Sequence, residues 1–284
     1  MTQFRCTLET LKQTLAEHGV AVLEGLLDEA ECARLEGGMW DWVTHTTSVW
    51  PTPVTRDPST WREFVAKLQP KKGLVQHPYW VGHAQFAWDV RQNPKVVKVF
   101  EAIWGTSDLV TSFDGWVFGL DPRVTNLGWG STPNLHIDQT EKCKVEGVAE
   151  CIQASITALD QEEGDATFLV LPGSHKMHGA FVDKCRESGV KVEGNWHKLT
   201  EDQKAYYSIE PVRIVCPKGS MVLWDSRTVH CGVPPVKPGK GKTSAKPKNR
   251  MVVFVCMQPR SRMLASIEAA LVRENADYDT LAGR

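Results

Sequence analysis

The stretch CIQASITALDQEEGDATFLVLPGSH, residues 151–175, decides the expected fold. In its first part Ile152, Ala154 and Ile156 alternate with polar residues, which is the period of a half-buried β-strand. A second apolar run, ATFLVL, follows the turn signal EEGD and ends at a Pro-Gly pair. This stretch therefore predicts two short strands joined by a turn.

Neighbouring segments extend this pattern along the chain. The runs DLVTSFDGWVFGL (108–120), GSMVLWDSRTVHCGV (219–233) and RMVVFVCMQP (250–259) also read as strands. Short strands divided by Gly and Pro, with helices on either side, predict an α+β fold with a barrel or jelly-roll core. We expect a single domain over residues 1–284, with the jelly-roll core at about 108–258.

The N-terminal region, about residues 1–107, is expected to be mainly helical. One helix is predicted over 7–19, with Thr7 as its N-cap, Leu8 on its apolar face and Gly19 as its stop. The run VAVLEGLL (20–27) reads as a strand. Further helices are expected over 28–43, where Asp28 and Glu31 have capping-box spacing, over 93–105, and at about 262–275 near the C-terminus.

Composition narrows the class of protein. The net charge of -1 argues against nucleic acid or an anionic membrane as the main partner. No stretch approaches 18 apolar residues and the first residues lack an apolar leader, so we expect neither a membrane span nor a signal peptide. The eight cysteines include no C-x-x-C pair, which favours reduced thiols in a cytoplasmic protein. We expect a monomer or a homodimer.

Three residues have the chemistry of a metal site. His136 and Asp138 form a His-x-Asp pair, and His230 ends a strand-like run downstream. Residues i and i+2 of a strand share a face, so the first two side chains can bind one ion. Two imidazoles and one carboxylate on one face of a metal are the facial triad of non-haem Fe(II) oxygenases, which leaves three octahedral positions for other ligands.

Arg250 begins the next strand after His230, and its planar guanidinium is a forked donor suited to a carboxylate. Between these two residues the segment PPVKPGKGKTSAKPKNR (234–250) holds five lysines together with Gly and Pro. It is expected to be a surface loop, with its lysine-rich part at 237–248. A mobile lid that attracts an anionic substrate is the alternative interpretation.

Four segments together resemble the phytanoyl-CoA dioxygenase-like family of Fe(II)/2-oxoglutarate-dependent oxygenases. They are NLHIDQT, the stretch 151–175, GSMVLWDSRTVHCG and NRMVVFV, and the early HGVAVLEGLLDEAECARLE is also similar. The resemblance covers about residues 15–258, and the GDAT…LPGSH element between the ligand segments makes it more specific than the triad alone. It implies a double-stranded β-helix (jelly-roll, cupin-like) core with helices packed outside.

The resemblance implies that His136, Asp138 and His230 bind Fe(II). Arg250 would pair with the distal carboxylate of the cosubstrate 2-oxoglutarate, and Thr167 would add a hydroxyl to it. The lysine-rich loop makes the interval from His230 to Arg250 longer than the family usually has. Two further side chains look as if they touch the cosubstrate: Asn134 and Gln153.

The implied reaction uses O2 to oxidise an unactivated C–H bond of a small molecule, for which an anion is one candidate, and releases succinate and CO2. Hydroxylation is the default outcome, desaturation or oxidative cyclisation in secondary metabolism are alternatives, and the presence of Asp138 argues against halogenation. A cupin-type metal enzyme without 2-oxoglutarate and a non-catalytic binding protein remain open. The candidates to face the substrate are Gln76, Trp80, Arg91 and Arg227.

Overall fold

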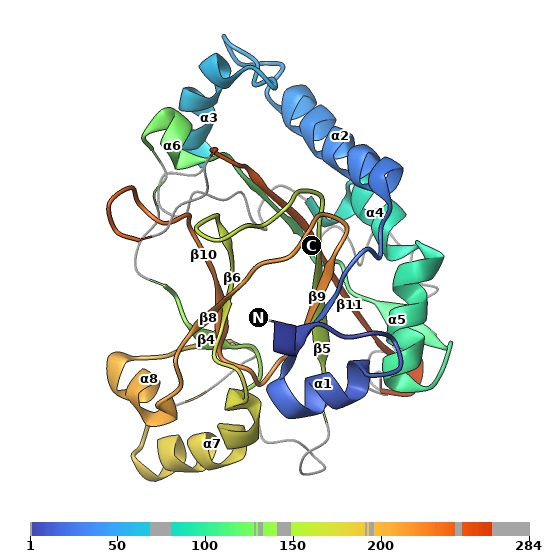
Figure 1. Cartoon of the computed structure of the whole chain (residues 1–284), viewed down its shortest axis with the longest axis vertical. Helices are drawn as coiled ribbons and strands as arrows, with labels where there is room; N and C mark the ends of the chain where they lie inside the picture. Colours follow the sequence, from blue (N-terminus) through green and yellow to red (C-terminus); the bar gives the residue numbers. More distant parts are fainter. Residues whose placement is uncertain are drawn as a thin grey trace, which may run out of the picture.

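Two antiparallel sheets face each other in the computed structural model, and helices cover the outer side of the larger sheet (Figure 1). The structure describes residues 2–68, 81–127, 129, 133–140, 149–190, 192, 196–241 and 246–262. The sheets do not close into a barrel. This arrangement confirms the predicted α+β fold with a jelly-roll core.

The larger sheet has the order β1–β9–β5–β11–β2, and β3 also pairs with β11. Because β11 is ten residues long, it reaches β5, β3 and β2 at different points along its length. The strands of this sheet are β1 Val20–Leu23, β2 Leu109–Thr111, β3 Trp116–Gly119, β5 Ile152–Thr157, β9 Met221–Asp225 and β11 Arg250–Pro259.

The smaller sheet has the order β7–β4–β10–β6–β8. Its central strand β10 pairs with β4 on one edge and with β6 on the other. The strands are β4 His136–Ile137, β6 Thr167–Val170, β7 His197–Lys198, β8 Val212–Ile214 and β10 His230–Val233.

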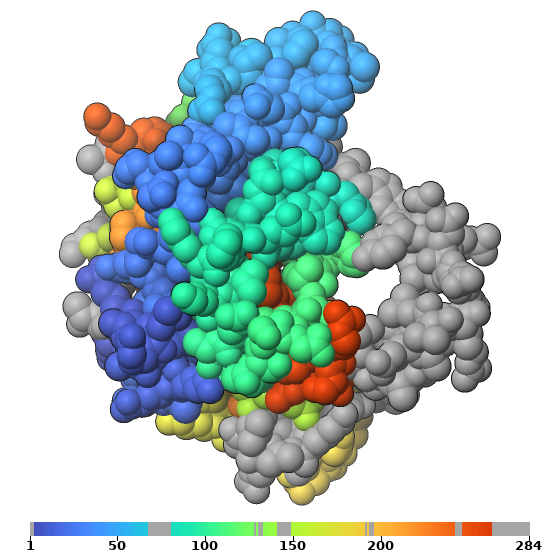
Figure 2. Space-filling view, turned by 90° about the vertical axis from the view of Figure 1, so that its right-hand side faces the viewer, coloured from blue at the N-terminus to red at the C-terminus, as the bar shows by residue number. Residues whose placement is uncertain are grey.

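Helices α2, α4 and α5 pack on the larger sheet, and Figure 2 shows them as the blue and teal part of that face. The capping box at the start of α2 is confirmed, because the Asp28 carboxylate accepts from Glu31 N and Glu31 accepts from Asp28 N. The helices are α1 Leu11–His18, α2 Glu29–Thr46, α3 Trp61–Leu68, α4 Gln85–Arg91, α5 Pro94–Trp104, α6 Pro122–Thr125, α7 His178–Glu187 and α8 Glu201–Tyr207.

The alternation in β5 places apolar side chains on the face toward the helices and polar side chains on the face toward the smaller sheet. Ile152, Ala154 and Ile156 are buried in the hydrophobic core that the helices share with the larger sheet. Gln153 points the other way and reaches Asp138, which follows β4 of the smaller sheet. The face of β5 toward the smaller sheet therefore carries polar side chains, beside an apolar cluster in which Trp224 of β9 meets Phe168 of β6.

Several sequence-based boundaries differ from the structure. The run 20–27 is a strand only over Val20–Leu23, and the run 108–120 contains two strands, β2 and β3. Helix α1 begins at Leu11 after Thr10, and Thr7 N donates to Thr10 Oγ1, so the predicted N-cap Thr7 is wrong. Leu8 precedes the helix and is 42% exposed, so it does not belong to the apolar face. The run 219–233 is two strands, because a turn closed by Thr228 N and Asp225 O moves the chain from one sheet to the other.

The predicted helix at 262–275 lies outside the described residues, apart from Arg262. The lysine-rich loop is described at 237–241 and 246–248, where Lys237 lies over the ring of Trp129 and Lys248 pairs with Glu162. Among the helices that the structure describes, none combines the length and the apolar character that a membrane crossing requires.

Candidate metal centre

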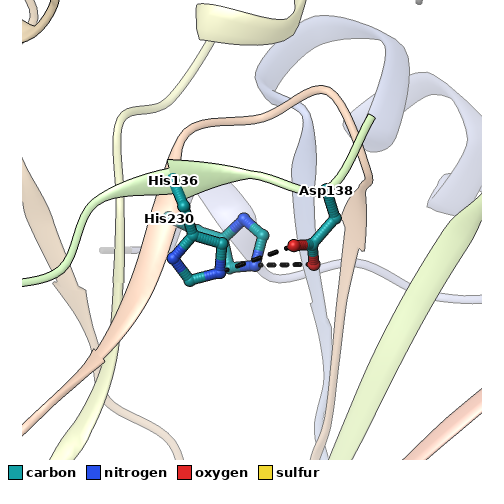
Figure 3. A group of neighbouring side chains, drawn as sticks. All are labelled: His136, Asp138 and His230. Carbon is teal, nitrogen blue, oxygen red and sulfur yellow. Dashed lines mark ion pairs between the residues drawn. The ribbon is translucent and has the colours of Figure 1, made fainter. Parts of the chain in front are cut away.

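His136 and His230 lie directly opposite each other in the antiparallel ladder of β4 and β10. Their ring centroids are 4.5 Å apart, and Figure 3 shows both rings turned toward Asp138. The register of two strands thus brings together histidines that are far apart in the sequence. This is the neighbouring-strand arrangement that the sequence required.

Asp138 completes the group from the end of β4. Its Oδ1 lies 3.6 Å from His136 Nε2 and its Oδ2 lies 3.4 Å from His230 Nε2. One ligand atom from each of the three residues falls within 4.8 Å of the others. Two atoms that each lie about 2.1 Å from one ion are roughly 3–4 Å apart, so the spacing suits a single divalent metal.

Backbone carbonyls orient both imidazole rings for metal binding. His136 Nδ1 lies 2.7 Å from Asn134 O, and His230 Nδ1 lies 2.8 Å from Thr228 O. A carbonyl oxygen only accepts, so each Nδ1 carries a proton, and each Nε2 is the ring nitrogen whose lone pair is available to a metal. Both lone pairs therefore belong to the nitrogens that face Asp138, and the donor set fits the Fe(II) triad.

Asp138 is held in its charged form. Burial alone would raise the pKa of this carboxyl, but its interactions with His230, His136 and the Gln153 amide bring the pKa below its usual value. Gln153 Nε2 donates to Asp138 Oδ2 at 2.9 Å, while Gln153 Oε1 is buried without a partner in the described structure. The predicted contact of Gln153 with a cosubstrate stays a prediction, and its contact with Asp138 is an additional finding.

The N-terminal helix supports His230 indirectly. Thr228, whose carbonyl orients His230, donates from its hydroxyl to Gly19 O at 2.9 Å. Gly19 ends α1 with a φ of 71°, as its predicted role as a stop requires. A Cβ at this position would lie 2.4 Å from His175 Nδ1 and 2.5 Å from Thr228 Oγ1. His175 is buried, and its Nε2 lies 3.2 Å from Ala16 O.

Arg250 is a buried cation that has no carboxylate within ion-pair distance among the described residues. Its side chain lies at the start of β11 and its Nε has no hydrogen-bond partner there. Burial lowers the pKa of Arg250 to about 10, which leaves the guanidinium charged at neutral pH. A buried charge without a counterion costs several kcal/mol, and an anionic ligand would offset that cost.

Thr167 and Asn134 already have roles within the protein. Thr167 Oγ1 lies 2.8 Å from Gln161 Oε1 and also contacts Ile214 O, and the residue is fully buried. Asn134 contributes its backbone carbonyl to His136. Contacts of these two side chains with a cosubstrate remain predictions.

The four substrate candidates do not form one group. Arg227 binds Asp225 with two nitrogens, at 2.8 and 2.6 Å, and both residues are buried. Arg91 is also buried and its terminal nitrogens donate to the carbonyls of Gly82 and Asp114. Both arginines therefore have internal contacts, and a contact of either one with a substrate stays a prediction. Gln76 and Trp80 lie outside the described residues.

Trp196 lies near the candidate metal centre and was not predicted from the sequence. It precedes β7, its ring centroid is 5.6 Å from that of His136, and 51% of its surface is exposed. A large aromatic side chain left half exposed beside a metal ligand can pack against an apolar part of a ligand. The signal in the sequence was a lone Trp in a polar stretch that also holds His197.

Comparisons with known proteins agree with this geometry. The family model of phytanoyl-CoA dioxygenase (PhyH) matches residues 15–234. Ava biosynthesis cluster protein O of Aspergillus versicolor is 27% identical over 213 residues, which cover 72% of this chain and 64% of the relative. The chain thus spans less than two thirds of that protein. A relative from Dictyostelium discoideum that carries the phytanoyl-CoA dioxygenase name is 24% identical and covers 86% of this chain and 73% of its own length.

A solved structure shows the same fold. It is the crystal structure of HygX from Streptomyces hygroscopicus with nickel and 2-oxoglutarate bound, with a TM-score of 0.55 and 13% identity. The match covers 90% of this chain and 88% of HygX.

Proposed function

The chain belongs to the phytanoyl-CoA dioxygenase family of Fe(II)/2-oxoglutarate-dependent oxygenases, and on that premise we propose that it oxidises an unactivated C–H bond of a small molecule. His136, Asp138 and His230 hold Fe(II) in this proposal, and Arg250 binds the distal carboxylate of 2-oxoglutarate. Two features found together support the proposal. The side chains of the triad are already oriented toward one point, and the buried Arg250 has no acidic partner among the described residues.

Each residue has a defined task in this reaction. When bound, Fe(II) and 2-oxoglutarate supply, with O2, the oxidant that removes a hydrogen atom from the substrate and leave succinate and CO2 as products. The triad would hold the metal through three protein ligands, which would leave coordination positions for exchangeable ligands. Arg250 fixes the orientation of the cosubstrate by a forked, charge-assisted contact.

Trp196 marks the side from which we propose that the substrate approaches. Its half-exposed ring borders His136, and it can pack against an apolar portion of the substrate. Hydroxylation is the default outcome of such chemistry, and a different pose of the substrate would give desaturation or ring closure. The similarity to a protein of a fungal biosynthesis cluster supports a substrate from secondary metabolism.

An anaerobic absorbance titration tests the proposal. Fe(II) and then 2-oxoglutarate are added to metal-free protein, and a weak visible charge-transfer band is expected. The band should vanish in His136→Ala and require far more 2-oxoglutarate in Arg250→Met, while Lys12→Met, an exposed change on α1, serves as the matched control. Iron binding without a band would favour a metal enzyme that does not use 2-oxoglutarate and would overturn the proposal.

A further inference from the structure

Two cysteines from neighbouring strands meet in the interior between the sheets. Cys151 immediately precedes β5 and Cys256 lies in β11, and their Sγ atoms are 3.5 Å apart. Both strands belong to the larger sheet, where Cys256 is the register partner of Gln153. Side chains opposite each other in an antiparallel pair share a face, so Cys256 lies on the face from which Gln153 reaches Asp138.

This pair differs from the other described cysteines in its surroundings. Cys151 and Cys256 are only half-buried, whereas Cys32, Cys185, Cys216 and Cys231 are buried. Cys6 is half-buried as well, but it lies against the carbonyl of Val22. Cys151 and Cys256 are thus the one pair of thiols in mutual contact among the described residues, and neither residue is fully buried.

The backbone connects the pair to the metal centre. Cys151 O accepts from Ser226 N at 3.1 Å, and Ser226 O accepts from Asp138 N at 3.0 Å. A second connection runs along β5, because Gln153 is two residues from Cys151 and donates to Asp138 Oδ2. A displacement of Cys151 would thus reach the Asp138 carboxylate through Ser226 and through Gln153.

We propose that Cys151 and Cys256 form a reversible disulfide when the protein meets a peroxide, and that this bond weakens metal binding at the triad. The pair is a modification site on the face of the larger sheet from which Gln153 reaches Asp138. The formation of the bond does not depend on the proposed function, whereas its effect on the metal rests on the triad being the metal site.

The chemistry needs hydrogen peroxide as the two-electron oxidant. The Cys151 thiolate attacks one peroxide oxygen, the O–O bond breaks, and protonation of the leaving hydroxide gives water and a Cys151 sulfenic acid. Cys256 sulfur then attacks the Cys151 sulfur, the S–O bond breaks, and the thiol proton leaves with the hydroxide as a second water. Two thiols are oxidised to one disulfide while one peroxide is reduced to two waters.

The positions of the two residues assign these roles. Either sulfur can donate in the contact, but Cys151 lies outside the β5–β11 ladder whereas Cys256 lies within β11. We therefore assign the first reaction to Cys151, which can move toward the oxidant, and the resolving step to Cys256.

Closing the bond requires movement at the end of β5. A disulfide has an S–S length of about 2.05 Å, so the two sulfurs must approach by roughly 1.5 Å. Cys151 lies just before the first residue of the strand, where the ladder of β5 and β11 does not hold it. We expect Cys151 to move rather than Cys256, which lies within β11.

Peptide mapping after oxidation tests the bond. Metal-free protein is treated with hydrogen peroxide, digested, and analysed by mass spectrometry with and without dithiothreitol. A Cys151–Cys256 crosslink that dithiothreitol reverses is expected in the native protein and in Cys6→Ser, the half-buried control, and not in Cys151→Ser or Cys256→Ser. A crosslink to Cys143, which lies outside the described residues, or peroxide resistance of Cys151 would overturn the proposal.

Mn(II) titration tests the link to the metal centre, because this ion prefers oxygen and nitrogen ligands to thiols. Oxidised protein should bind Mn(II) about tenfold more weakly than reduced protein, the effect typical of disturbing residues that support a metal ligand. The double variant Cys151→Ser, Cys256→Ser should bind like reduced protein before and after peroxide. A confirmed crosslink with unchanged Mn(II) affinity would disprove the link, whereas no Mn(II) binding in reduced protein would contradict the proposed function instead.

Discussion

Gln153 Nε2 donates to Asp138 Oδ2 at 2.9 Å and joins the larger sheet to the metal ligand that follows β4. The hydrogen bond restrains one carboxylate oxygen, so that the Asp138 side chain keeps a fixed orientation between His136 and His230. A metal ligand that is fixed in advance loses less conformational freedom when the ion binds.

Replacing Gln153 with Leu should therefore weaken metal binding more than it weakens folding. The substitution keeps the size of the side chain but removes the donor, and we expect roughly 10–100-fold lower Mn(II) affinity. Isothermal titration of metal-free protein measures this change. Ser155→Ala, two residues further on the same face of β5, is the control. Equal Mn(II) affinity in Gln153→Leu and native protein would refute a positioning role for Gln153.

Arg250→Met should stabilise the protein when no ligand is bound. The change removes a buried charge that has no carboxylate partner in the described structure, and the free energy of unfolding should rise by on the order of 1–3 kcal/mol. The same variant should lose the increase in melting temperature that 2-oxoglutarate gives the metal-loaded native protein. Urea unfolding and thermal scans with and without 2-oxoglutarate measure the two effects. A marked loss of stability would indicate an internal partner for Arg250.

Arg227→Met should have the opposite effect on stability. Arg227 and Asp225 form a buried pair with two hydrogen bonds, so the substitution leaves the Asp225 carboxylate buried without its cation. We expect a loss of about 3–5 kcal/mol in the free energy of unfolding. Urea unfolding under the conditions used for Arg250→Met gives a direct comparison. If Arg227→Met is as stable as native protein and only substrate affinity falls, Arg227 faces the substrate after all.

Gly19→Ala should disturb both folding and the metal centre. The added methyl meets His175 and Thr228 at a backbone φ that favours glycine, and we expect a loss of roughly 2 kcal/mol or more. Because Thr228 orients His230, the variant should also bind Mn(II) more weakly. Gly105→Ala, at the end of α5, has a similar φ but open space around its Cβ and should affect folding alone. A normal Mn(II) affinity in Gly19→Ala would show that the end of α1 does not support the metal centre.

Thr167→Val should cost stability through a lost internal hydrogen bond. The Thr167 hydroxyl lies against Gln161 Oε1 in the interior, and removing it leaves a buried amide oxygen without that donor. A loss of about 1–3 kcal/mol is expected in urea unfolding. Titration with 2-oxoglutarate distinguishes the two roles considered for this residue. Binding weakened tenfold or more, at unchanged stability, would show that the hydroxyl serves the cosubstrate.

Strand periodicity was sufficient to predict much of the centre. The i, i+2 spacing of His136 and Asp138 places both on one face, and the apolar run before His230 predicts a strand there. The run beginning at Arg250 also forms a strand with the expected bounds. The register that sets His136 opposite His230 depends on the pairing of β4 and β10, which no local pattern encodes.

The internal contacts of Arg227 and Arg91 differ in how far the sequence could predict them. The partner of Arg227 is Asp225, two residues earlier, so a signal was present in the sequence. Arg91 instead donates to backbone carbonyls, and every residue has a carbonyl, so its contacts have no signature in the side-chain pattern. Trp196 was missed because its position beside His136 follows from the pairing of β7 with β4.

The length of β11 has a consequence for protection against hydrogen exchange. Residues 252–255 pair with β5 on one edge, and Val252 and Val253 also pair with β3 on the other edge. Exchange of their amides therefore requires opening of the larger sheet. Their exchange rates should therefore report the free energy of global unfolding. Because Arg250 starts this strand, a bound anion would slow exchange along β11 at amides that it never touches.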